Sequence, residues 1–220
     1  MAETGGANNS TRIYRSARRD EQARRTRQRI IEAARERFLA SGYTTTTMRG
    51  IATAAGVAVQ TVELTFGTKR ALFKAVIDAT IAGDDEPIPM LQREQAKAAE
   101  ATADIETFLA IVGQTVQTVA ERVAGILAVL DEAASVDDEI TALARELDAQ
   151  RAMTAAWILR GITERASLRA ELSHDTALDT IWLLMDPVVF RRLTRNRGWS
   201  ADKFQHWFTD GIQRLLLTPR

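Results

Sequence analysis

The sequence predicts an all-α fold with a small N-terminal domain and a larger C-terminal domain. Its apolar residues recur at the three- and four-residue spacing of amphipathic helices, and no stretch of useful length alternates in the manner of a β-strand. Glycines fall between these stretches, often close to a serine or threonine that can cap the next helix. The 29 basic and 29 acidic side chains of the 220 residues cancel in total but are unevenly distributed. These observations indicate two helical domains of unlike charge.

The charge distribution suggests where the domains divide. Residues 1–75 carry 14 basic and 6 acidic side chains, a formal charge of +8, so the remaining 145 residues carry −8. This asymmetry favours a nucleic-acid-binding module joined to an acidic partner domain, although an arginine-rich solubilising segment would give the same count. We expect a flexible basic arm at 1–19, a basic helical domain at 20–68 and an acidic helical domain at 69–220.

Composition excludes several classes of site. The chain has no cysteine, which excludes disulfides, thiolate metal sites and thiol catalysis. Its two histidines, His174 and His206, are 32 residues apart and lack any accompanying nucleophile or metal-ligand spacing. We therefore expect no catalytic residue, no metal, no cofactor and no enzyme activity. No apolar run approaches the roughly 20 residues that span a bilayer, and the polar N-terminus lacks a signal sequence, so we expect a cytoplasmic protein without a membrane partner.

Three helices are predicted in the basic part. The first begins near Asp20 and ends at Gly42, because glycine tolerates the left-handed backbone of a helix C-terminus. A hydroxyl within Thr44–Thr47 can cap a second, short helix that ends before Gly56. A third short helix is predicted at Val59–Phe66. The apolar face of the first helix consists of Ile30, Ala33, Ala34 and Phe38.

The acidic part also has a helical pattern. Thr68 can cap a helix that runs to Gly83, and charge and proline interrupt the pattern at Asp84–Pro89. A long stretch without glycine or proline follows, which Ser135 and Asp138 can divide in the manner of a capping box.

Two further helices are predicted near the C-terminus. Ser173 can cap a helix that Pro187 interrupts and Gly198 ends, and Ser200 can cap the last helix. The last helix has the clearest amphipathic stripe in the chain. This stripe comprises Phe204, Trp207, Phe208, Gly211, Ile212, Leu215 and Leu216.

The segment Met48–Thr65 has the spacing of a helix-turn-helix. Counted from Met48, the small residue Ala52 is fifth, Gly56 is ninth and the apolar Val62 is fifteenth. Small residues allow the two helices to approach closely, and the glycine allows the tight turn that sets the second helix for the DNA major groove. The alternative is an ordinary helical hairpin within a core, but the basic charge of this part favours DNA binding.

The stretch Arg29–Phe73 resembles the N-terminal domain of TetR-type bacterial transcriptional repressors. The rest of the chain is similar to the family's ligand-binding and dimerisation domain only in its length and helical pattern. The residues that carry the resemblance are Ile30–Ala34, Phe38, Gly42–Thr44, Thr46–Thr47, Ile51–Ala52, Ala55–Val57, Thr61–Val62, Phe66, Lys69 and Leu72–Phe73.

The resemblance implies a ligand-responsive transcriptional regulator. It would be a repressor that binds a palindromic operator on double-stranded DNA as a homodimer and is released by a small-molecule effector. A helix-turn-helix domain at 20–68 and a ligand-binding and dimerisation domain at 69–220 would follow. The alternative is a helical small-molecule-binding or interaction protein whose DNA binding is weakened or lost.

The family's DNA contacts fall on identifiable positions of this sequence. Val59, Gln60 and Thr61 resemble the base-reading residues, and the Gln60 amide can pair bidentately with adenine. The family's phosphate contacts, which fix register on the duplex, suggest a matching role for four further residues, although a threonine here can equally cap a helix. These four are Thr47, Arg49, Thr65 and Lys69.

Glu63 departs from the family pattern. It places a negative charge where the family often has a tyrosine near the DNA backbone, and Thr65 replaces an aromatic residue or histidine. Repulsion by phosphates would weaken binding. Glu63 could instead pair with an arginine, accept a hydrogen bond from a cytosine amine or mark an altered DNA affinity.

Bulky apolar residues of the second part suggest a pocket and an interface, although each of them can equally be core. An apolar or aromatic effector would suit a pocket with few polar groups. The candidate pocket residues are Phe108, Met153, Trp157, Trp182, Met185 and Phe190, and the candidate dimer residues on the last helix are Trp207, Phe208, Ile212 and Leu215.

Overall fold

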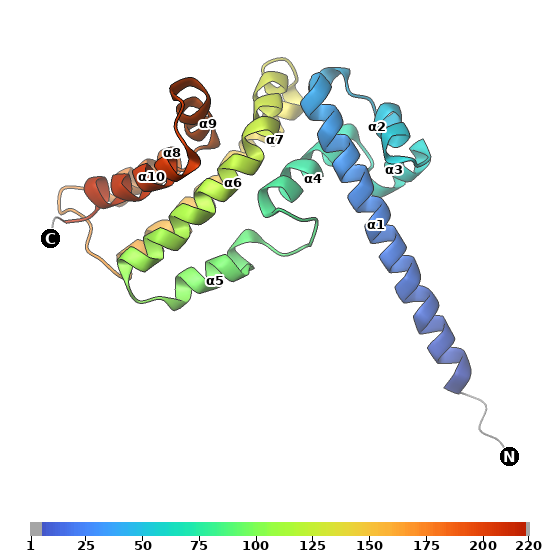
Figure 1. Cartoon of the computed structure of the whole chain (residues 1–220), viewed down its shortest axis with the longest axis horizontal. Helices are drawn as coiled ribbons and strands as arrows, with labels where there is room; N and C mark the ends of the chain where they lie inside the picture. The colour runs from blue at the N-terminus through green and yellow to red at the C-terminus, as the bar shows by residue number, and fades with distance from the viewer. Residues whose placement is uncertain (1–5, 219–220) are drawn as a thin grey trace. The chain divides into compact units, whose positions relative to one another are not determined.

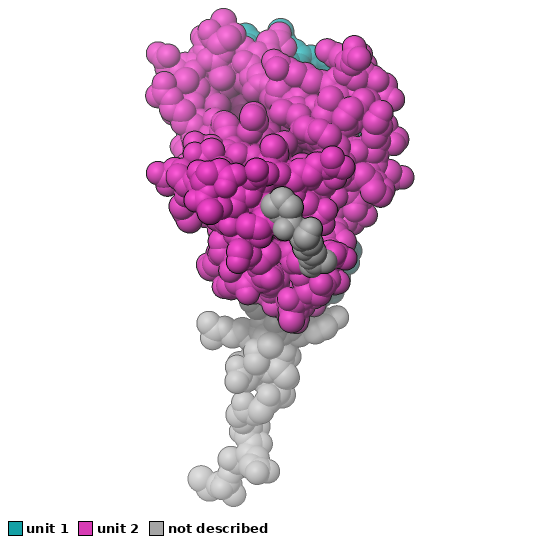
Figure 2. Space-filling model, turned by 90° about the vertical axis from the view of Figure 1, so that its left-hand side faces the viewer, with its two compact units in different colours: residues 1–76 teal, residues 77–220 magenta. Residues whose placement is uncertain are grey.

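The computed structural model describes the backbone of residues 6–218 and the side chains of residues 18–218. The described residues are mostly helical, and their one β-type pairing is an isolated antiparallel bridge between Leu168 and Leu217, so the all-α prediction is confirmed (Figure 1). The chain divides into two compact units, residues 1–76 and 77–220 (Figure 2). The division falls inside α4 (Lys69–Ala82), whereas the sequence suggested a boundary just before that helix.

The first helix, α1 (Gly6–Thr45), begins well before the expected start near Asp20. Residues 6–19, expected as part of a flexible arm, are helical, and residues 1–5 of that arm lie outside the described residues. Arginine and alanine, which favour helix, are frequent in this segment, and Glu21 forms ion pairs with Arg24 and Arg25 one turn further on. Gly42 has a φ of 76°, in agreement with the predicted break at this residue.

The next two helices, α2 (Met48–Ala55) and α3 (Val59–Phe66), match the predicted elements. A cluster of aromatic rings forms part of the core of the first unit. The rings of Phe38 and Phe73 meet edge-on with centroids 4.6 Å apart, and Tyr43 lies 5.0 Å from Phe73. These contacts join the end of α1 to α4 and so support the two short helices.

The second unit is built around the long helix α6. This helix packs against α5, α7, α9 and α10, and Figure 1 shows α6 and α7 running side by side. The elements are a 3₁₀ turn at Met90–Gln92, α5 (Glu94–Ala101), α6 (Ile105–Ala134), α7 (Asp138–Thr163), α8 (His174–Leu184), α9 (Pro187–Arg191), a π-helical turn at Arg192–Asn196 and α10 (Ala201–Leu216).

Helix starts in this unit follow the capping rules. Ser173 caps α8 and Ser200 caps α10, as predicted, by accepting hydrogen bonds from backbone N–H groups. The predicted division of the long helical stretch is present, but Asp137 is the cap of α7, and Ser135 lies at the end of α6. The carboxylate of Asp137 accepts from two backbone N–H groups, which explains its advantage over a serine hydroxyl.

A glycine of α7 lies against the ring of a phenylalanine of α6. A Cβ atom added to Gly161 of α7 would lie 2.3 Å from the ring of Phe108 on α6, which is fully buried. The guanidinium carbon of Arg165, also on α7, lies 4.6 Å from the centroid of this ring. The Arg165 guanidinium also donates to the carbonyls of Thr102 and Gly161, at 2.8 and 2.7 Å, and thereby connects the end of α5 to α7.

Gly161→Ala should destabilise the protein although alanine favours helix. The added methyl group would overlap the Phe108 ring, and overpacking of this kind costs about 1–3 kcal/mol of unfolding free energy. Gly211→Ala in α10 is the matched control, because its Cβ would meet Leu184 at an ordinary 3.5 Å. We expect the control to leave stability unchanged or to raise it by up to about 1 kcal/mol. Urea unfolding followed by circular dichroism measures both, and equal stabilities would contradict the close contact.

Candidate DNA-binding surface and ligand cavity

The turn between α2 and α3 fixes the angle of the second helix. Thr47 caps α2 by accepting from the Gly50 N–H at 3.0 Å, and Gly56 ends α2 with a left-handed φ of 65°. The Val57 N–H then returns to the Ala52 carbonyl at 3.0 Å. Ala52 and Val62 are buried between the helices, which is the packing expected of a helix-turn-helix.

One face of α3 is open to solvent. Gln60 and Glu63 are exposed on this short helix, whereas Val59 and Thr61 are half-buried. Thr65 is also exposed, but its hydroxyl donates to the Thr61 carbonyl at 2.7 Å. Gln60 is therefore well placed as the predicted base-reading residue, and the hydroxyl proton of Thr65 is already used within the helix.

Leu64 is a surface residue that the sequence analysis did not single out. Its side chain is 88% exposed, near the middle of α3. The sequence held a signal for it, because Leu64 lies two positions from the buried Val62 and so falls off the packed face of the helix. An exposed leucine here offers an apolar contact of the kind that thymine methyl groups accept.

The candidate phosphate-binding residues differ in how they are placed. Arg49 is exposed on α2, and Thr47 already accepts the capping hydrogen bond. Lys69 is half-buried, and its ammonium group donates to the carbonyls of Tyr43 and Thr46 at 3.0 and 3.2 Å. The Lys69 ammonium also lies 4.1 Å from the centroid of the Tyr43 ring. Lys69 thus connects the start of α4 to the end of α1, which is a structural role that the sequence did not suggest.

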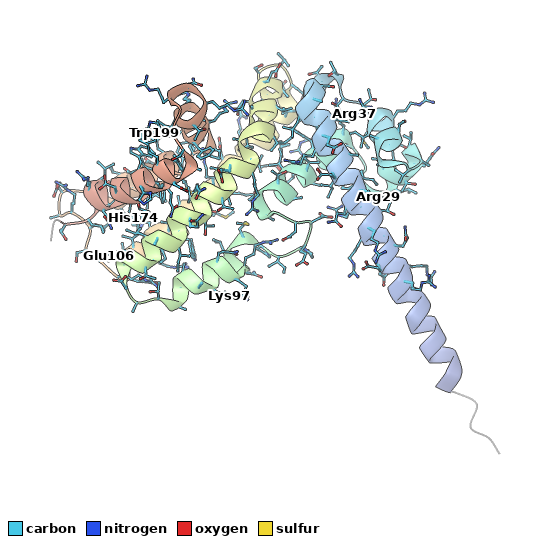
Figure 3. All side chains as sticks on the ribbon, in the orientation of Figure 1. Arg29, Arg37, Lys97, Glu106, His174 and Trp199 are labelled. Atoms are coloured by element: carbon cyan, nitrogen blue, oxygen red, sulfur yellow. The ribbon has the colours of Figure 1, made fainter. Side chains whose placement is uncertain are left out.

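Arginines of α1 add positive charge to the first unit. Arg29 and Arg37 are exposed, and Figure 3 labels both on this helix. The guanidinium carbon of Arg27 lies 4.7 Å above the ring of Phe66 at the end of α3, so α1 also contacts the third helix. Among the described side chains, no arginine forms an ion pair with Glu63, which leaves the hypothesis of an arginine partner without support.

The second unit contains a cavity of about 960 Å³ that is partly open to solvent. Its lining comes from the end of α4, the segment 84–92, α6, α7 and the turn between α8 and α9. Three of the predicted pocket residues, Met153, Trp182 and Met185, line it.

The other three predicted pocket residues do not line the cavity. Phe108 packs against Gly161 in the core, and the buried Phe190 meets the ring of Phe204 edge-on at 5.0 Å. Trp157 donates from Nε1 to the Glu100 carboxylate at 2.7 Å. Spacing along a helix could not separate these residues from the lining, because core and cavity share the same apolar faces.

The cavity carries more charge than the sequence suggested. Asp84 is held by a bidentate pair with the Arg93 guanidinium, at 2.6 and 2.8 Å, which lowers the pKa of Asp84 to about 2. Arg151 forms ion pairs with Asp186 at 3.0 Å and Asp148 at 3.1 Å. The lining thus combines the apolar surface expected from the sequence with carboxylates that the sequence did not suggest. The lining carboxylates are those of Asp78, Asp84, Asp85, Glu86, Asp131, Asp148 and Asp186.

The candidate dimer residues of α10 divide into two groups. Phe208 and Ile212 are fully buried within the single chain, so they are not available to a partner and their assignment to an interface is corrected. Trp207 is half-buried, and Leu215 is 52% exposed. Leu183 on α8, which packs against α10, is similarly exposed and was not predicted.

The described residues hold neither a membrane-spanning helix nor a cluster of metal ligands. Across residues 6–218, no helix is long and apolar enough to cross a membrane. Within the same part of the chain, no group of three histidine, aspartate or glutamate residues is placed to hold a metal ion. His174 is exposed at the start of α8, where Figure 3 labels it.

Several solved structures share this fold. NalD, the secondary repressor of the MexAB-OprM multidrug efflux pump in Pseudomonas aeruginosa, is 20% identical, with 89% of this chain and 98% of that chain covered and a TM-score of 0.68. The complex of SmeT with triclosan is 15% identical, with 88% and 92% covered and a TM-score of 0.67. A transcriptional regulator from Saccharomonospora viridis in complex with choline is 17% identical, with 88% and 98% covered and a TM-score of 0.65.

Comparison of sequences finds a family model that matches part of the first unit. No curated protein matches the chain. Residues 30–76, which contain α2, α3 and the rings that support them, match the model of the bacterial regulatory proteins of the tetR family. The similarity of this chain to the tetR family in sequence is thus carried by residues 30–76 of the first unit.

Proposed function

We propose that this protein is a ligand-responsive transcriptional repressor that binds a palindromic operator as a homodimer. The observation that carries the proposal is the exposed face of α3, which presents Gln60, Glu63 and Leu64 beyond a buried helix-turn-helix wedge. The +8 charge of residues 1–75 supplies the attraction to DNA that such a face needs.

The three exposed side chains supply different base contacts. The amide of Gln60 can pair bidentately with adenine, and Leu64 can contact a thymine methyl group. The Glu63 carboxylate can accept from a cytosine amine, which would turn an unfavourable charge into a preference for one base. Together they would read a short half-site in the major groove.

A homodimer would present two copies of α3 to the duplex. Two-fold symmetry places recognition helices about 34–36 Å apart, one turn of DNA, and matches a palindromic site. Leu183 on α8 and Leu215 on α10 offer exposed apolar contacts on packed helices for a partner chain.

The cavity supports regulation by a small molecule. Its volume of about 960 Å³ lies at the upper end of the range usual for drug-sized ligands. Proteins of the same fold have been solved with triclosan and with choline bound, and NalD is itself a repressor. We propose that occupation of the cavity favours a state of the protein that releases the operator.

A second candidate function is a helical ligand-binding protein with weakened DNA binding. The exposed Glu63 favours it, because no described arginine neutralises this carboxylate. Selection of bound fragments from genomic DNA, followed by gel shifts at several salt concentrations, separates the two candidates. Recovery of a palindrome with salt-dependent affinity supports the repressor, and no enriched sequence would contradict it.

Gln60→Ala should weaken binding to the selected operator. Loss of a bidentate pair with adenine costs about 1–3 kcal/mol of discrimination, so the preference for adenine at one position of each half-site should relax. Fluorescence anisotropy with operators altered at single positions measures this. Gln95→Ala, an exposed glutamine on α5, is the control and should bind as the unaltered protein does. Equal losses on all sequences would contradict a base-reading role.

Arg49→Ala and Lys69→Met should have separable effects. Arg49 is exposed, so its loss should reduce the slope of log affinity against log salt by about 1 and leave the unfolding temperature unchanged.

Lys69 donates to two carbonyls within the domain, so its loss should cost about 1–3 kcal/mol of stability. Salt titrations and thermal unfolding provide the two measurements. A stable Lys69→Met protein with a reduced salt slope would show that Lys69 mainly contacts phosphate.

Leu215→Glu should produce monomers that bind the operator poorly. A charge at this exposed position would be desolvated in an interface, whereas the monomer keeps it in water. Val136→Glu, at an exposed position after α6, should remain dimeric, and Ile212→Glu should unfold because Ile212 is fully buried. Sedimentation velocity gives the oligomeric state. A Leu215→Glu dimer as tight as the unaltered protein would argue against an interface through α10.

A further inference from the structure

We infer that the cavity of the second unit selects an amphipathic organic cation, with an apolar aromatic or alkyl body and a positive charge. This inference rests on the proposed function, because it names the chemical class of the effector. Three features of the lining carry it: an apolar wall, an excess of carboxylates, and a single arginine that is already engaged.

The apolar wall accounts for the body of the ligand. The inward face of α6 contributes Val119, Val123 and Leu127. Met153 of α7 and Trp182 of α8 extend this surface, and apolar residues of the segment 84–92 complete it. Methionine is flexible and polarisable and tryptophan offers a flat face, so together they can accommodate aromatic groups of different shape.

The charges of the lining are strongly unequal. Seven carboxylates line the cavity, whereas Arg151 is the one lysine or arginine among the lining residues. Arg93 and Arg191 do not line the cavity but pair with Asp84 at 2.6 Å and with Asp131 at 3.7 Å. Arg122, also outside the lining, acts on Asp84 as well. Even with these three arginines included, carboxylates predominate, so the potential inside the cavity favours a cation.

Asp131 is a half-exposed carboxylate of the lining that has only a long ion pair. Burial raises its pKa, and the neighbouring carboxylates of Asp186 and Asp148 add to this, although Arg191 and Arg151 act in the opposite direction. Its nearest cation, Arg191, is 3.7 Å away, which is longer than a good charge-assisted hydrogen bond. A ligand cation could approach the Asp131 carboxylate more closely than Arg191 does.

Arg151 is poorly placed to bind an anion instead. Its two terminal nitrogens pair with Asp186 at 3.0 Å and with Asp148 at 3.1 Å. Its guanidinium carbon also lies 4.1 Å from the centroid of the Trp182 ring. Only its buried Nε has no hydrogen-bond partner, and an anion that reached this nitrogen would lie close to the carboxylates of Asp148 and Asp186. The lining therefore discriminates against anions of the same size and shape.

Two ions of nearly equal shape and opposite charge test the inference directly. Tetraphenylphosphonium and tetraphenylborate are added to the full-length protein, and binding is measured by calorimetry and by the shift in unfolding temperature. We expect tetraphenylphosphonium to bind at least tenfold more tightly and to raise the unfolding temperature in a concentration-dependent manner. Equal affinities, tighter binding of tetraphenylborate, or binding of neither ion would overturn the inference.

Asp131→Asn locates the cation within the cavity. Removal of this charge should weaken tetraphenylphosphonium binding about tenfold and leave tetraphenylborate binding unchanged or improved. Glu132→Gln is the matched control, because Glu132 is the next residue of α6, is exposed as Asp131 is, and does not line the cavity. Equal affinity of both variants would contradict the role of Asp131. If Asp131→Asn is unstable, the comparison of the two ions on the unaltered protein still decides the charge preference.

Operator binding is measured on the same preparations without either ion. Loss of cation binding with intact operator binding would overturn this inference alone. Absence of operator binding would overturn the proposed function, whatever the two ions do.

Discussion

The contact between Phe108 and Gly161 determines how the second unit is assembled. Because Gly161 has no side chain, α7 approaches the α6 ring closely enough for the two helices to pack along their length. Arg165 then covers the ring and binds carbonyls at the end of α5, so three helices meet at one residue. Asp131, near the other end of α6, and Asp148, in the first half of α7, line the cavity, so the two helices that meet at Gly161 also form part of its wall.

Much of the fold could be predicted because its signals are local. Gly42 and Gly56 adopt the positive φ angles expected of helix ends, and Ser173 and Ser200 cap the helices that follow them. The early start of α1 was missed because arginine-rich sequence is typical both of solvated arms and of exposed helices. Local chemistry does not distinguish between these two states.

Other features depend on contacts between distant parts of the chain. Lys69 resembles a phosphate-binding residue in sequence, but its ammonium group is drawn to carbonyls 23 and 26 residues earlier. Phe208 and Ile212 lie on a clear amphipathic stripe, yet the stripe alone does not say whether it faces the same chain or a partner. The cavity carboxylates come from α4, α6, α7, the segment 84–92 and the turn before α9, so no single stretch of sequence signals them.

The ion pair of Asp84 and Arg93 has a consequence for ligand affinity. Arg93 also donates to the Ile88 carbonyl at 3.2 Å, so one side chain binds both the start and the middle of the segment 84–92. The pKa of Asp84, about 2, keeps this pair ionised well below neutral pH, and only protonation near that value would open it. The segment 84–92, which forms part of the cavity wall, therefore loses its conformational entropy during folding, before a ligand binds. A molecule that enters meets a preorganised surface, and less of its binding energy is spent on ordering the protein.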